Sequence, residues 1–166
     1  MGCDIHILIE YRAKRGAWPD KWTSFGYKPI NPGRSYELFN KLSGVRGDND
    51  DPIATSGWPR DVSWAANCAN NIYITEDSEK VREGVVSMET AQHYVKSNFS
   101  KFISNAEGKI VAVTNPDWHS HGYCTVKQMA KALRGNTSPV YRAMVAAARS
   151  LYKDNMDVRF IFFYDN

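Results

Sequence analysis

The two ends of the chain carry its clearest alternation of apolar and polar positions. Within residues 3–11 isoleucine stands at positions 5, 7 and 9, and residues 157–164 place valine, phenylalanine or tyrosine at every second position. A period of two is typical of a β-strand with one face toward a core. We expect these two apolar strands to be neighbours in the centre of one sheet, which would order both termini. Asp165 or Asn166 would then lie near one end of the strand that carries Asp4 and His6.

The segments between these strands predict several helices. Thr125-Val126-Lys127-Gln128 has the spacing of a capping box and opens a helix that closes at Gly135. Ser138-Pro139 starts another helix, because proline is favoured at the first helical position. Further patterns predict helices over residues 36–42, ending at Gly44, and 87–102, and strands over residues 71–75 and 109–114. Residues 12–34 and 45–70 predict long loops, because glycine and proline interrupt them.

Length and composition favour one folded unit. A chain of 166 residues is long enough for one core, and two domains are not expected. We predict a single domain over residues 1–166 with a mixed α/β fold of the α+β type, in which helices and long loops pack on a central sheet holding both terminal strands. The chain is 43% hydrophobic and 23% charged, and no apolar run approaches the roughly 20 residues of a membrane helix. No basic start or apolar leader opens the chain, so we expect a cytoplasmic protein.

Three of the four histidines occur in two short alternating motifs. Asp4-Ile5-His6 lies in the first apolar run, and His119-Ser120-His121 follows Asp117-Trp118. In an extended segment, residues i and i+2 point to the same side, so each motif is expected to present two polar groups on one face. We predict that the two motifs converge in one polar pocket.

Metal binding is one interpretation of this pocket. Histidine nitrogens and carboxylate oxygens form a mixed ligand set that suits a divalent transition metal such as zinc or manganese. The spacing fits no structural zinc pattern, so the motifs alone do not separate metal binding from other roles. The predicted ligands are Asp4, His6, His119, His121 and Asp117.

Three other interpretations stay open. In metal-free catalysis, His119 or His121 acts as general acid or base, because histidine titrates near neutral pH, while arginines neutralise a phosphate. In pure binding, the pocket holds a nucleotide-like ligand without turnover. In a purely structural role, the motifs organise a polar layer and the turn that leads to Thr125. The predicted ligand-binding residues are Arg34, Arg46, Arg60 and Trp58.

Positive charge is concentrated in residues 12–34, which we call the basic aromatic loop. The chain has a net charge of +3, but this loop alone has six basic residues against one acid. It also carries Trp18, Trp22, Phe25 and Tyr27. Cations interleaved with aromatic rings can hold phosphates while bases stack on the rings. The alternative is that the rings attach the loop to the core while the charges stay in water.

Five segments spread over most of the chain are similar to those of a known family. They are MGCDIHILIEYR, LFNKLSGVRGD, SGWPRDVS, DWHSHGYCTVKQM and DVRFIFFYDN. Together they resemble a family of small bacteriophage proteins that begin Met-Gly-Cys-Asp-Ile-His and have no assigned activity. The resemblance implies an accessory protein in the cytoplasm of an infected bacterium, where counter-defence proteins are a frequent class. It implies no particular fold or catalytic residue.

The preferred function is recognition of a phosphorylated, nucleotide-like small molecule in the His/Asp/Arg pocket. With turnover, the protein would be a metal-dependent or histidine-dependent phosphoester hydrolase. The rival is an inhibitor that binds a host protein through the basic aromatic loop, because Trp, Tyr and Arg dominate interface hot spots. Nucleic acid is a less favoured partner, and no membrane partner is expected. The pocket predicts convergent His and Arg side chains, whereas the rival predicts several exposed aromatic rings in one patch.

Overall fold

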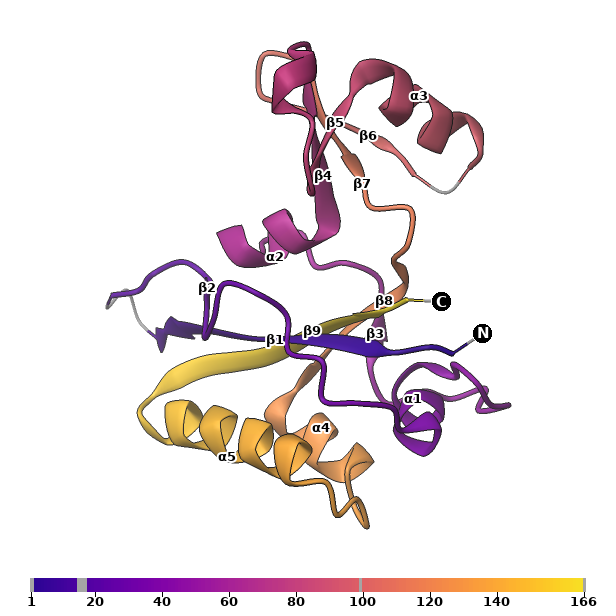
Figure 1. Ribbon diagram of the computed structural model, residues 1–166. Coiled ribbons are helices and arrows are strands. Elements are labelled where there is room, and N and C mark those ends of the chain that lie inside the picture. The colour runs from indigo at the N-terminus through magenta and orange to yellow at the C-terminus, as the bar shows by residue number, and fades with distance from the viewer. Residues whose placement is uncertain (1, 15–17, 99, 166) are drawn as a thin grey trace. The chain divides into compact units, whose positions relative to one another are not determined.

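The computed structural model describes residues 2–14, 18–98 and 100–165 (Figure 1). The chain forms two compact units. The first consists of Met1–Ala66 with His119–Asn166, and the second of Asn67–Trp118. A compact unit is defined by its contacts and a domain by independent folding, so the single domain expected from the sequence stays a prediction.

The first unit is built on an antiparallel sheet of five strands. β1 and β9 pair without interruption, from Ile5 opposite Tyr164 to Ala13 opposite Met156. The prediction that the two terminal strands are neighbours in a central sheet is therefore confirmed, as is the mixed α+β fold class. The strand order is β2 (Thr23–Ser24), β1 (Ile5–Ala13), β9 (Met156–Tyr164), β8 (His119–Thr125) and β3 (Thr55–Ser56).

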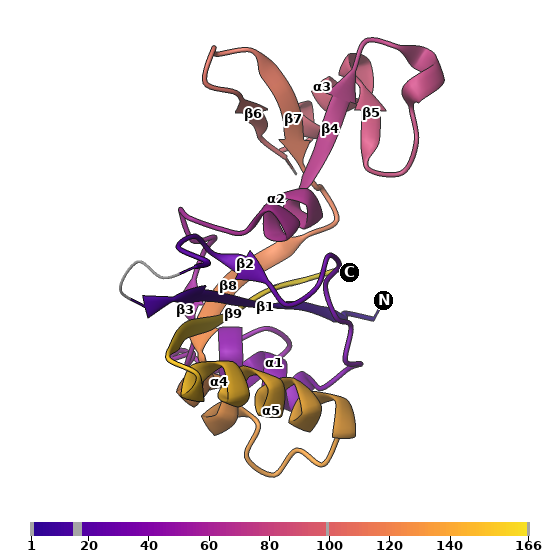
Figure 2. The same cartoon turned by 90° about the vertical axis from the view of Figure 1, so that its left-hand side faces the viewer.

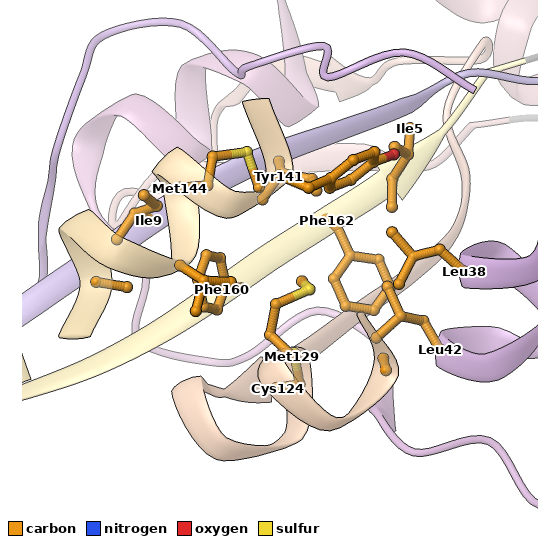
Figure 3. Close-up of a cluster of buried hydrophobic side chains, with 14 of the residues drawn as sticks. Ile5, Ile9, Leu38, Leu42, Cys124, Met129, Tyr141, Met144, Phe160 and Phe162 are labelled. Carbon is orange, nitrogen blue, oxygen red and sulfur yellow. The ribbon is translucent and has the colours of Figure 1, made fainter. Parts of the chain in front are cut away.

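Three helices cover one face of this sheet, as Figure 2 shows. They are α1 (Tyr36–Ser43), α4 (Val126–Ala132) and α5 (Pro139–Lys153). Alternate residues of β1 and β9 point to this face and pack against apolar side chains of the helices (Figure 3). This is the core that the period of two predicted. Its buried residues include Ile5, Ile7, Ile9, Leu38, Leu42, Met129, Met144, Phe160 and Phe162.

Local signals in the sequence set the ends of these helices. Thr125 Oγ1 accepts a hydrogen bond from the backbone N–H of Gln128, and the Gln128 side chain accepts one from the backbone N–H of Thr125. This is the predicted capping box. Gly44 follows α1 with φ 69°, a left-handed conformation that glycine adopts without steric cost. Pro139 stands in the first turn of α5, as predicted.

The opposite face of the sheet is buried as well. Leu8 and Glu10 of β1 and Phe163 of β9 are at most 2% exposed. Residues 58–66 contribute to this cover, because the ring of Trp58 contacts Phe163 and the backbone N–H of Ser63 binds Glu10. β1 is therefore a strand with two buried faces, and its acidic residue requires hydrogen-bond partners.

The second unit contains a four-stranded sheet and one longer helix. The strands lie in the order β5 (Val85–Ser87), β4 (Asn71–Thr75), β7 (Ile110–Thr114) and β6 (Phe102–Ser104). α3 (Met88–Lys96) follows β5 and contacts this sheet, and a short 3₁₀ helix, η2 (Ser78–Lys80), precedes β5. The predicted strands over 71–75 and 109–114 correspond to β4 and β7.

Three predictions of secondary structure need correction, and one of them is the long loop expected over residues 12–34, which contains the end of β1 and the short strand β2. The helix expected over residues 87–102 ends at Lys96, because the chain turns at Asn98, where φ is 61°, and Phe102 begins a strand. α2 (Trp64–Asn70) lies inside the segment 45–70 that was expected to be a loop. It is too short to show a clear helical period. In the part of the chain that the structure describes, no helix has the length and apolarity to cross a membrane.

Gly122 provides a test of how tightly the core is packed. A Cβ atom at this position would lie 2.7 Å from the ring of Phe162, which is fully buried. Because the added Cβ would also approach the backbone oxygen of Thr55 to 3.2 Å, we expect Gly122→Ala to lower the free energy of unfolding by about 1–3 kcal/mol, the usual cost of overpacking. Gly26→Ala is the control, because a Cβ there would meet only a carbonyl oxygen at 3.8 Å. Urea unfolding of both variants measures the difference, and equal stability would contradict the packing argument.

Candidate functional site

The N-terminal histidine motif is held by Asp165. One carboxylate oxygen of Asp165 accepts a hydrogen bond from the backbone N–H of Asp4 (2.8 Å), and the other lies 2.9 Å from Nε2 of His6. Arg34 forms an ion pair with Asp4, and its hydrogen bond holds the pKa of the Asp4 carboxyl below the usual value. The expected position of Asp165 is confirmed, whereas Asn166 lies outside the described residues. We call Asp4, His6, Arg34 and Asp165 the terminal cluster.

The second motif does not present its two histidines on one face. The pairing of β8 with β9 contains a β-bulge near the start of β8, where Ser120 has φ 48°. His119 consequently stacks on Tyr164 on the helix-covered face, with ring centroids 5.9 Å apart. His121 instead contacts Phe163 on the opposite face, also at 5.9 Å. The prediction from alternation is wrong here, because one extra residue in a strand reverses which face the later residues occupy.

One histidine from each motif nevertheless meets the same aromatic ring. His6 and His121 both contact Phe163, which lies on β9 between their strands. Trp58 meets the ring of His121 edge to face at 5.2 Å. Burial lowers the pKa of His121, and the neighbouring His119 lowers it further, so His121 is neutral at pH 7. A neutral imidazole among aromatic rings is unsuited to neutralising a phosphate.

The other predicted site residues do not complete a common pocket. Arg46 lies near Cys3, where burial raises the pKa of the thiol and the guanidinium acts in the opposite direction. Arg60 is exposed and has no ion pair with any residue that the structure describes. Asp117 belongs to the second unit, where its backbone N–H binds the side chain of Asn115.

The geometry does not support a metal site. The bulge places His119 and His121 on opposite faces, and Nε2 of His119 is buried without a hydrogen-bond partner among the described residues. Across residues 2–14, 18–98 and 100–165, no three His, Cys, Asp or Glu side chains are grouped so that they could hold a metal ion. The metal site expected from the sequence stays a prediction.

A buried ion pair links β1 to β9 away from the terminal cluster. Glu10 and Arg159 stand opposite each other in the ladder, and Oε2 of Glu10 accepts a hydrogen bond from Nε of Arg159 (2.8 Å). Oε1 of Glu10 accepts a hydrogen bond from the backbone N–H of Ser63 (2.6 Å). Both oxygens of this fully buried carboxylate are therefore satisfied, which removes most of the cost of burying it.

Trp22 and Asp61 extend this pair toward the surface. The guanidinium groups of Arg159 and Arg12 lie over the ring of Trp22, at 3.9 and 4.6 Å from its centroid. The indole N–H of Trp22 donates to Asp61 (3.0 Å), which also pairs with both arginines. Burial alone would raise the pKa of Asp61, but its hydrogen bonds and the charge of Arg159 lower it overall. These contacts hold two guanidinium groups in defined orientations.

A groove of about 1050 Å³ opens next to these arginines. It forms because β8 ends at Thr125, opposite Arg159, whereas β9 begins earlier, at Met156. The first residues of β9 therefore pair only with β1. α4 and α5 supply further lining residues, and aromatic rings of Trp22, Tyr123 and Tyr152 complete the walls. We call this cavity the basic groove.

The basic groove carries an excess of positive charge. Among the described lining residues the one carboxylate is Asp157, which pairs with Arg12. The basic lining residues are Arg12, Lys127, Lys131, Arg134, Arg149 and Arg159. Four of these cations are exposed and have no ion pair within the described part of the chain: Lys127, Lys131, Arg134 and Arg149. Four uncompensated charges around one cavity produce a positive potential that attracts anions.

Sequence reasoning missed this groove. None of the predicted ligand-binding residues lines it, because its cations come from β1, β9, α4, α5 and the turn after α4, which only the fold brings together. One signal was available in the predicted capping-box helix. Lys127 and Lys131 are four residues apart, so they lie on one face and repel each other unless an anion lies nearby.

The basic aromatic loop supports both of its interpretations in part. Trp22 attaches the loop to the arginines and Asp61, as the structural alternative expected. Trp18, Phe25 and Tyr27 are instead 86%, 56% and 84% exposed, so they do not anchor the loop. Arg15 lies outside the described residues.

Comparisons with protein-family models, curated proteins and solved structures found no match for this chain. The resemblance to a phage family stays a prediction, and the functional argument rests on the geometry of the basic groove.

The buried ion pair predicts a large effect from a small substitution. Glu10→Gln keeps the shape of the side chain but removes the charge that Arg159 faces, and it turns one acceptor into a donor. We expect the free energy of unfolding to fall by about 3–5 kcal/mol, as when one partner of a buried pair is lost. Glu37→Gln, which breaks an exposed pair with Lys41, is the matched control and should cost at most about 1 kcal/mol. Similar losses for the two variants in chemical unfolding would show that burial of Glu10 is unimportant.

The lowered pKa of His121 predicts how stability depends on pH. The unfolded state binds this proton at about pH 6.5 and the folded state only at lower pH, so its contribution to stability is complete above about 6.5 and is lost as the pH falls through the folded value. His121→Phe keeps the ring contacts but cannot be protonated. We expect the variant to lose less stability than the wild type between about pH 7 and pH 5. Urea midpoints across this range measure it, and parallel curves would contradict the assignment.

Proposed function

We propose that the protein binds a phosphorylated, nucleotide-like ligand in the basic groove. The observation that carries the proposal is the set of four cations without carboxylate partners among the described residues, Lys127, Lys131, Arg134 and Arg149, around one cavity. Lysine and arginine donate charge-assisted hydrogen bonds to phosphate oxygens, which are roughly twice as strong as neutral ones. Arg12 and Arg159, already oriented by their acidic partners, add two donors nearby.

The walls of the groove suit the rest of such a ligand. A cavity of about 1050 Å³ is slightly larger than most small-molecule sites, which span roughly 300–1,000 Å³. Tyr123 and Tyr152 supply aromatic surface, and Lys14 lies 4.8 Å from the ring centroid of Tyr152. A planar base beside the phosphate-binding cations would contact these rings.

Binding without turnover fits the groove better than hydrolysis does. Burial raises the pKa of the Cys124 thiol in its wall to about 12, so the thiol is protonated at neutral pH and is a poor nucleophile. His119 and His121, the predicted catalytic residues, stand near the other end of β8. Neither histidine is among the described residues that line the groove, and four residues of extended chain, roughly 13 Å, separate His119 from Tyr123 in its wall.

A phage accessory role in the host cytoplasm, with sequestration of a nucleotide signal as counter-defence, is compatible with this proposal. The rival role, inhibition of a host protein, has one observation in its favour, the exposed rings of the basic aromatic loop. The two roles differ in what the four unpaired cations do. Only ligand binding in the groove requires them.

Charge removal in the groove tests the proposal. We expect Lys131→Gln and Arg149→Gln each to weaken binding of a nucleoside triphosphate about tenfold, because each removes a charged donor worth about 1.4 kcal/mol or more. Isothermal titration calorimetry with the four ribonucleoside triphosphates, at low and high salt, measures this. Stability should change little, since exposed charges contribute little to folding.

Two exposed cations outside the groove are the matched controls. Lys96→Gln on α3 and Arg142→Gln on α5 remove the same charge without touching the cavity lining. They should leave the affinity unchanged. Equal losses in all four variants would reveal a general charge effect, and no binding of any triphosphate by the wild type would overturn the proposal.

A further inference from the structure

A second cavity adjoins the basic groove across Trp22. It has a volume of about 480 Å³, and Trp22 contributes to the lining of both cavities. Its chemistry is opposite to that of the groove, because no charged side chain is among its described lining residues. The rings of Tyr11, Phe25, Tyr27 and Trp64 surround it instead. We call it the aromatic cavity.

Three of these rings are unusually exposed. Phe25, Tyr27 and Trp64 are 56%, 84% and 68% exposed, although each lies at the rim of the same cavity. The ring of Trp22 is different, because two guanidinium groups lie over it and its N–H binds Asp61. Trp22 therefore acts as a fixed wall, and the exposed rings around the aromatic cavity are available for stacking.

We infer that the ligand of the two cavities together is single-stranded nucleic acid. Its phosphates lie in the basic groove, and neighbouring bases stack on Phe25, Tyr27 and Trp64. The inference rests on the proposed function, since it assigns the ligand of that same groove. Alternation of a cationic track with aromatic platforms is the arrangement by which proteins bind single strands without strong sequence preference.

The number of cations and the adjoining exposed rings favour a single strand over a mononucleotide, a duplex or a protein. A mononucleotide has one base, and its phosphates all lie at one end. The groove has four cations without partners among the described residues, and the cavity beside it has three exposed rings, so one nucleotide would leave part of this surface unused. A duplex keeps its base faces stacked inside, so it leaves the rings unused. A protein partner would bury the aromatic rings but would gain from the basic groove only where it is acidic.

A length series separates this inference from the proposed function. Oligothymidylates of one, two, four, six and eight nucleotides, all 5′-phosphorylated, are titrated by fluorescence anisotropy competition at several salt concentrations. We expect affinity to rise at least about tenfold from the mononucleotide to the longer strands, since stacking of each further base adds to it. The association constant should also fall more steeply with salt concentration as the strand lengthens, until all the cations are occupied. In a plot of log association constant against log salt concentration, each phosphate contact should add about −0.7 to the slope.

Variants then assign the gain to the aromatic cavity. Trp64→Ala and Tyr27→Ala should remove most of the gain with length and leave the mononucleotide affinity unchanged, while Trp64→Phe, which keeps a ring, should retain the gain. Trp18→Ala is the control, because Trp18 is 86% exposed and is not among the lining residues of either cavity. Lys131→Gln should weaken binding at every length.

Each failure has its own meaning. Affinity that does not depend on length, or a gain that both Trp64→Ala and Tyr27→Ala leave intact, would overturn the single-strand inference and leave the proposed function in place. A duplex that binds as tightly as the single strand would also overturn the inference. Binding that Lys131→Gln leaves unchanged at every length would overturn the proposed function itself.

Discussion

The ladder between β1 and β9 is the constraint on which the first unit depends. It joins Ile5 to Tyr164 and continues to Ala13 and Met156 without a break. The same register places Glu10 opposite Arg159 and Arg12 opposite Asp157, so two pairs of opposite charge face each other across the strands. A slip by one residue would turn these side chains to the other face and leave buried charges without partners. The pairing of β1 with β9 thus also orients the arginines of the basic groove.

The cations of the first unit differ in how they are compensated. Arg159 and Arg12 are held by carboxylates and by Trp22, so their side-chain entropy is already low before any ligand arrives. Lys127, Lys131 and Arg149 project from helices that pack by their opposite sides against the sheet. In the proposed function, preorganised donors beside exposed, unpaired ones would fix one phosphate and adapt to others.

Regular features could be predicted from the sequence, because they depend on neighbours in the chain. The period of two at both ends, the capping box at Thr125 and the glycine after α1 each follow from local geometry, and each is present. α2 was missed because seven residues give too short a period.

The candidate site could be predicted only in fragments. Alternation already predicted that Asp4 and His6 of the terminal cluster lie together. The bulge at Ser120, which separates His119 from His121, could not be predicted, because no glycine marks it in the sequence. The basic groove depends on where β8 stops relative to β9, a difference between two strands that no single segment of sequence reveals.

The pairing of Asp4 with Asp165 joins positions 161 residues apart in the chain. Loop closure over such a separation must precede the contacts that reward it, which makes assembly of the central sheet slow compared with formation of the helices. During translation, the apolar strand β1 leaves the ribosome long before β9 exists, and both of its buried faces stay uncovered in that interval. The apolar segment Ile5–Ile9 therefore stays open to chaperone binding or aggregation until β9 has been made.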